Sequence, residues 1–111
     1  MKSEENIPDS PKVAYRRALT LAQGGRADSA LPLLKYASSR GDINACYALA
    51  TWYLYGVEVP KNRNKAITLL EIAVSGGLAT AAYDLAVCFE TGKADVRDQK
   101  RSKELYEFAA S

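Results

Sequence analysis

Residues 49–66 read LATWYLYGVEVPKNRNKA and predict two helices joined by a loop. Ala45, Leu49 and Tyr53 recur every four residues, which is the spacing of one face of an amphipathic helix. Gly56 is typical of the residue that follows a helix, and Asn62 is a good N-cap for the next helix. Helical spacing then resumes in Ala66, Leu69, Leu70 and Ala73.

The same pattern returns 36 residues later. Aligning residues 41–75 with 77–111 gives 10 identities in 35 pairs, where composition alone would give about three. An earlier, degenerate copy contains Ala30, Leu33, Leu34 and Ala37, and its loop is about four residues shorter. We therefore predict a flexible N-terminal tail (1–10) and three helix-turn-helix repeats, at about 11–41, 42–77 and 78–111.

The spacing of these residues resembles the Sel1-like repeat, a subclass of the tetratricopeptide-like helical repeats. The resemblance runs through Leu49-Ala50, Tyr53, Gly56, Val59, Asn62 and Lys65-Ala66. The chain departs from the family's pattern at Ala50 and Ala86, which replace a packing glycine, at Glu58, which replaces a loop glycine, and at Asn62, which replaces an aspartate. Over about residues 11–111, the resemblance implies an all-α fold, a short right-handed α-solenoid in which each helix pair contacts only its neighbours. It also implies a non-catalytic adaptor or scaffold.

Composition excludes several kinds of site. The chain has 111 residues, 15 Lys+Arg against 13 Asp+Glu, and no histidine. The lack of histidine removes Ser-His-Asp and Cys-His catalytic arrangements and every zinc site that needs an imidazole. We expect Cys46 and Cys88 to be reduced core residues. No enzymatic activity, cofactor or metal is predicted.

The N-terminus and the charge predict a cytoplasmic protein. Acidic and turn-forming residues follow Met1-Lys2, where a secretory signal would have an apolar stretch. The longest uncharged run, 43–57, is shorter than the about 20 apolar residues of a membrane span. The pI is about 8.5, lower than is typical of a dedicated nucleic-acid binder. We therefore expect no membrane span and no nucleic-acid partner.

One candidate surface is a groove. In tetratricopeptide-like stacks the first helix of each pair lines a concave face, and aromatic rings there can anchor a peptide. Tyr47 and Tyr83 occupy the same place in successive repeats; the alternative is that these rings pack between repeats. Trp52, Tyr53 and Phe89 are expected in the core. The predicted partner-binding residues are Arg16, Asn44, Tyr47, Thr51, Leu54, Tyr55, Thr80, Tyr83, Val87 and Glu90.

A second candidate surface is a basic edge, which the repeat period assembles from two loops. An acidic partner would be steered to it; the alternative is a solvated edge without a partner. The basic edge consists of Lys61, Arg63, Lys65, Arg97, Lys100 and Arg101.

A third candidate is the C-terminal end of the stack, where Leu105, Tyr106 and Phe108 are expected to leave apolar surface. A longer array, a homo-oligomer or a docked partner would explain such an end. We predict a module that binds a protein or peptide through the groove or this end, a specific form being a bacterial adaptor or a toxin-neutralising immunity protein. The alternatives are a small enzyme or ligand binder that uses groove carboxylates, and a regulatory module that binds an acidic partner through the basic edge.

Overall fold

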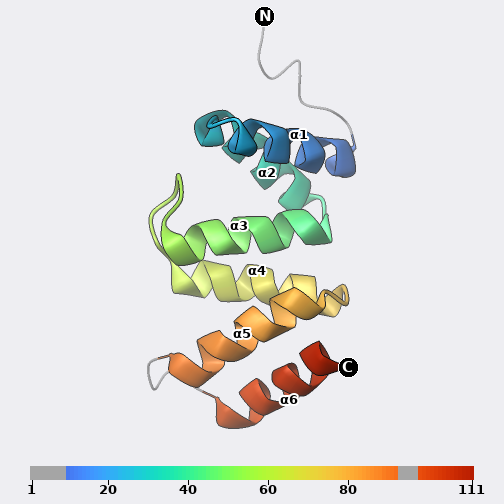
Figure 1. Ribbon diagram of the computed structural model, residues 1–111, viewed down its shortest axis with the longest axis vertical. Coiled ribbons are helices and arrows are strands. Elements are labelled where there is room, and N and C mark those ends of the chain that lie inside the picture. Colours follow the sequence, from blue (N-terminus) through green and yellow to red (C-terminus); the bar gives the residue numbers. More distant parts are fainter. Residues whose placement is uncertain (1–9, 93–97) are drawn as a thin grey trace, which may run out of the picture.

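The computed structural model describes residues 10–92 and 98–111, which form six α-helices and no strand. Successive helices pack against one another in chain order, so three hairpins stack along an axis (Figure 1). The molecule is elongated, at 51 × 27 × 21 Å. These features confirm the predicted all-α helical-repeat fold. The helices are α1 Pro11–Gln23, α2 Ala27–Ser39, α3 Ile43–Tyr55, α4 Arg63–Ser75, α5 Ala79–Thr91 and α6 Gln99–Ala110.

Side-chain caps determine where four of the helices begin. Ser10, Asp42, Asn62 and Asp98 each accept a hydrogen bond from the backbone N–H three residues further on. Such a cap satisfies one of the amide groups that have no partner inside the helix. Gly56 ends α3 in the left-handed conformation, with φ of 73°, which suits a residue without a Cβ. The expected caps at Asn62 and Asp98 are therefore present.

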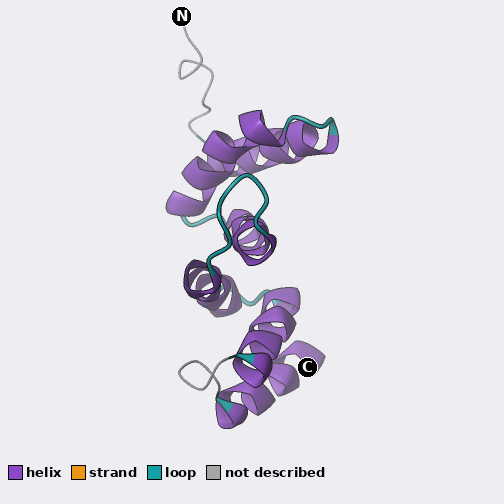
Figure 2. Cartoon of the chain, turned by 90° about the vertical axis from the view of Figure 1, so that its left-hand side faces the viewer, coloured by secondary structure: helices purple, strands orange, loops and turns teal. Residues whose placement is uncertain are grey.

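The core consists of two clusters along the stack. The first lies within α1–α3 and the second within α3–α6, and Tyr53 and Leu69 pack against both. Alanines predominate among the buried residues, and their small side chains suit close packing of helices. Figure 2 shows the described residues as helices joined by loops. Cys46 and Cys88 are buried free thiols, as the sequence predicted.

Polar side chains also join the second hairpin to the third. The Tyr47 hydroxyl on α3 donates to the Asp84 carboxylate on α5 at 2.7 Å. The Arg101 guanidinium on α6 pairs with the Glu71 carboxylate on α4, also at 2.7 Å. Each contact connects equivalent helices of adjacent hairpins, so it depends on how the hairpins stack.

No helix among the described residues has the length and apolar character needed to cross a membrane.

Candidate interaction surface

A cavity of about 390 Å³ lies between α3 and α5. It brings together four of the predicted groove residues, Leu54, Tyr55, Tyr83 and Val87, with Thr91 beside them. The exposed fractions of Tyr55 and Tyr83 are 72% and 55%, which are high for large aromatic residues. Its remaining lining residues are Arg63, Asp84 and Cys88.

The two exposed tyrosines owe their position to the helices that carry them. Tyr55 is the last residue of α3, immediately before the left-handed Gly56. On α5, the buried face consists of Ala81, Ala82, Leu85 and Ala86, and Tyr83 lies between these positions on the other side. Burying the small side chains turns the large ring outward, because successive helical residues point about 100° apart.

Tyr47 has a different environment, although it occupies the same repeat position as Tyr83. It is half-buried, and its hydroxyl is held by Asp84. Burial, together with the hydrogen bond to the Asp84 carboxylate, raises the pKa of Tyr47 to about 12. Tyr47 therefore joins two hairpins and orients Asp84, whereas Tyr83 is available at the surface.

The remaining groove positions on α1 and α3 do not line this cavity. Arg16 and Asn44 are exposed. Thr51 is half-buried, and its hydroxyl donates to the backbone carbonyl of Ala48 in its own helix. The sequence predicted these positions on the same concave face as the tyrosines. The cavity, however, lies near the C-terminal end of α3, at Leu54 and Tyr55.

The two described arginines of the predicted basic edge each contact a neighbouring helix. Arg101 binds Glu71, and Nη1 of Arg63 donates to the Cys88 carbonyl at 3.4 Å. Arg97 lies outside the described residues. The sequence did not indicate these partners. Both arginines lie close after a loop, where a charged residue is expected at the surface, and their partners come from a neighbouring hairpin.

The lysines of the basic edge are exposed. The ammonium group of Lys65 lies 5.4 Å from the centre of the Tyr53 ring, a cation–π distance. Lys61 and Lys100 complete the described part of this edge. Arg101 is paired with Glu71, whereas Arg63 and the three lysines keep their positive charge at this edge.

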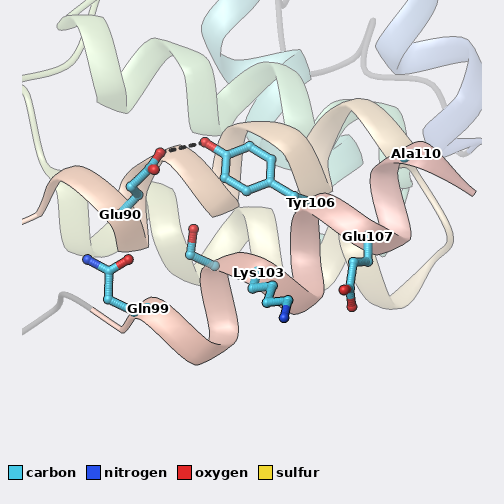
Figure 3. A pocket seen from close by; sticks show the side chains of 7 residues that line it. Glu90, Gln99, Lys103, Tyr106, Glu107 and Ala110 are labelled. Atoms are coloured by element: carbon cyan, nitrogen blue, oxygen red, sulfur yellow. Dashed lines mark hydrogen bonds between the residues drawn. The ribbon is translucent and has the colours of Figure 1, made fainter.

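Two further cavities lie at the C-terminal end, and one of them adjoins the first. One, of about 400 Å³, lies between α5 and α6; it shares Tyr83 with the first cavity and is otherwise lined by Ala79, Thr80, Tyr106, Ala109 and Ala110. The other, of about 350 Å³, shares Tyr106 and contains Glu90, Gln99, Ser102, Lys103, Glu107 and Ala110 (Figure 3). Tyr83 and Tyr106 therefore form the walls between neighbouring hollows of one continuous surface.

Tyr106 is the centre of this end of the surface. Its ring meets Tyr83 edge to face, with centroids 5.6 Å apart, and its hydroxyl donates to Glu90 at 2.7 Å. That hydrogen bond, more than burial, raises the pKa of Tyr106 to about 12. Sequence reasoning had placed Tyr106 in an apolar end with Leu105 and Phe108. Leu105 is instead buried, and Phe108 is 42% exposed.

The carboxylates at this end do not face each other. Glu90 is turned toward the Tyr106 hydroxyl, whereas Glu107 points away from that pair (Figure 3). Both are exposed to solvent. Burial raises the pKa of the Cys88 thiol, so this cysteine is poorly suited to act as a nucleophile. The surface offers aromatic rings, hollows and fixed charges, which are features of binding.

Comparison with known proteins places the helical repeats in a family. The Sel1 repeat matches residues 43–78 and 79–111. A Sel1 repeat protein from Oxalobacter formigenes has a similar crystal structure, with a TM-score of 0.82, 26% identity, and coverage of 90% of this chain and 78% of that one. A protective antigen of uropathogenic Escherichia coli strains that displays an SLR fold gives a TM-score of 0.84 and 25% identity, over 91% of this chain and 22% of that one.

A fungal protein is also similar in sequence. The chitin synthase regulator SKT5 of Malassezia restricta is 34% identical over 86 residues. The match covers 74% of this chain and 6% of the fungal protein, so the chain spans a small part of that relative's length.

Proposed function

The chain belongs to the Sel1 repeat family, and we propose that it is an interaction module that binds a segment of a partner protein across Tyr55 and Tyr83. The segment would lie in the cavity between α3 and α5 and continue toward Tyr106. A module of this kind acts by holding its partner, and a role as an adaptor or as a neutralising immunity protein fits that action.

The observation that carries the proposal is the exposure of Tyr55 and Tyr83 on the wall of one cavity. Tyrosine contributes large contact area with few rotatable bonds, and binding energy concentrates on such residues. Other exposed large apolar residues, such as Ile72 on α4, do not line this cavity. The placement of the two rings, rather than the amount of apolar surface, supports this site.

Selection of peptides from a random display library on the full chain would test the proposal. We expect the selected peptides to lose most of their affinity for the variants Tyr55→Ala and Tyr83→Ala. Ile72→Ala is the matched control, because it removes a similarly exposed side chain from another helix. Circular dichroism would check that each variant stays folded. Selected peptides that bind the tyrosine variants and the native chain equally would contradict the proposal.

A further inference from the structure

The surface around Tyr83 combines aromatic rings with carboxylates that form no ion pair within residues 10–92 and 98–111. We propose that it binds a lysine or arginine side chain of the partner segment at Tyr83, Glu90 and Tyr106, and that an apolar neighbour of this residue enters the cavity beside Ala79 and Ala109. This inference rests on the proposed function and specifies the chemistry of the bound segment.

Two carboxylates on this surface carry a negative charge that no ion pair among the described residues offsets. Asp84 and Glu90 each accept a hydrogen bond from a tyrosine hydroxyl, of Tyr47 and Tyr106 respectively. Within residues 10–92 and 98–111, neither carboxylate forms an ion pair. A neutral hydroxyl orients a carboxylate without cancelling its charge. A cation from a partner would therefore gain a charge-assisted hydrogen bond to an acceptor already held in place.

The rings of Tyr83 and Tyr106 leave aromatic surface open beside Glu90's partner. Tyr106 meets Tyr83 at an interplanar angle of 66°, so the edge of one ring is directed at the other. Because Tyr83 remains 55% exposed in spite of this contact, part of its ring is open to solvent. An ammonium or guanidinium group that binds Glu90 would lie beside Tyr106, whose ring contacts Tyr83, and aromatic ring faces attract cations.

A cavity with small lining residues lies beside the two rings. The cavity between α5 and α6 has a volume of about 400 Å³, and its lining residues other than the tyrosines are Ala79, Thr80, Ala109 and Ala110. These small side chains leave a hollow with an apolar lining. It suits an aliphatic side chain next to the basic residue of the bound segment.

Among the described residues, Lys103 and Arg63 are the positive charges that line these cavities, and their positions favour one direction for the segment. Lys103 lines the cavity that contains Glu90, but its ammonium group points away from the Glu90–Tyr106 pair (Figure 3). Arg63 lies in the cavity between α3 and α5 and binds the Cys88 carbonyl there. A basic residue of the partner is therefore favoured at Glu90 and disfavoured beside Arg63.

The test uses the peptides selected on the full chain. We expect them to share a lysine or arginine next to an apolar residue. Replacing that lysine by acetyl-lysine, or that arginine by citrulline, should weaken binding about tenfold, the scale of one charge-assisted contact. The variant Glu90→Gln keeps an acceptor for Tyr106 and should weaken the unmodified peptide by a similar factor. For Glu90→Gln, neutralising the basic residue of the peptide should weaken binding little further. Glu104→Gln is the matched control, since Glu104 is an exposed carboxylate on α6 that lines none of these three cavities.

The outcomes separate this inference from the function on which it rests. Peptides that need Tyr55 and Tyr83 but bind Glu90→Gln with native affinity would overturn the inference and leave the proposed function standing. Peptides without a basic residue that bind through the same tyrosines would do the same. Peptides indifferent to the tyrosines would overturn both.

Discussion

At the scale of single residues, equivalent repeat positions have acquired different roles. Tyr47 and Tyr83 are 36 residues apart and both lie in the second turn of a first helix. The next hairpin supplies Asp84 to Tyr47, whereas Tyr83 contacts the Tyr106 ring and stays exposed. The same residue type thus joins hairpins at one position and forms candidate binding surface at the other.

Alkaline titration would distinguish the two roles. The pKa of Tyr47 rises from 10.0 to about 12, so the fold favours its neutral form. The resulting stabilisation is complete below pH 10 and is lost as the pH rises through about 12. We expect Tyr47→Phe to cost about 1 kcal/mol near neutral pH and to remove part of this alkaline loss. Urea unfolding at a series of pH values would measure both effects.

Tyr55→Phe is the control for this titration, because Tyr55 is 72% exposed and its hydroxyl forms no hydrogen bond within residues 10–92 and 98–111. An equal loss of stability in both variants would show that the bond to Asp84 contributes nothing. The same holds if the native chain and Tyr47→Phe lose stability in parallel above pH 10.

At the scale of elements, short local signals determine where each helix begins and ends. Polar caps occur at Ser10, Asp42, Asn62 and Asp98, but α5 follows Leu78, which makes no side-chain cap. Leu78 instead packs against the second core cluster. Apolar contact between hairpins therefore replaces a cap at this junction, and the helix still begins at the position that the repeat predicts.

The ion pair between Arg101 and Glu71 gives a measurable link between α4 and α6. The exposed fractions of the two side chains are 37% and 40%, so solvent and salt weaken the attraction. A double-mutant cycle with Arg101→Gln and Glu71→Gln should give a coupling of at most about 1 kcal/mol. The coupling should fall when salt is raised. A value well above this range, or one insensitive to salt, would mean that the pair is shielded from solvent.

At the scale of the whole molecule, the stack is nearly one-dimensional. Its two core clusters meet through Tyr53 and Leu69, and each helix packs mainly against its neighbours in the chain. In such a stack the stability of one hairpin depends on its own packing and on the adjacent interface. Partial opening from either end is the expected consequence.

Amide hydrogen exchange of Leu34→Ala would test this behaviour. Leu34 is fully buried in the first cluster, so the truncation should cost about 2–5 kcal/mol. We expect exchange to accelerate in α1 and α2 more than in α5 and α6. Leu105 is buried in the second cluster, so Leu105→Ala should accelerate exchange in α5 and α6 more than in α1 and α2. Uniform acceleration along the chain in both variants would indicate that the three hairpins unfold as one unit.

The amino-acid sequence by itself determined the helical-repeat fold. Helix-ending Gly56 and the caps at Asn62 and Asp98 act within one hairpin, and small residues such as Ala45 and Ala81 recur at equivalent repeat positions, so a pattern along the chain is enough to recognise them. Part of the candidate site followed as well, because Leu54, Tyr55, Tyr83 and Val87 do lie together.

Only the tertiary structure decided which of these residues remain available. Four contacts join residues of different helices: Arg63 with the Cys88 carbonyl, Arg101 with Glu71, Tyr47 with Asp84, and Tyr106 with Glu90. Such contacts depend on the rotation and offset between stacked hairpins and hairpin halves, and the helical period along the chain carries no record of either. The period determines which face of each helix is buried, and the stacking determines what each exposed side chain meets.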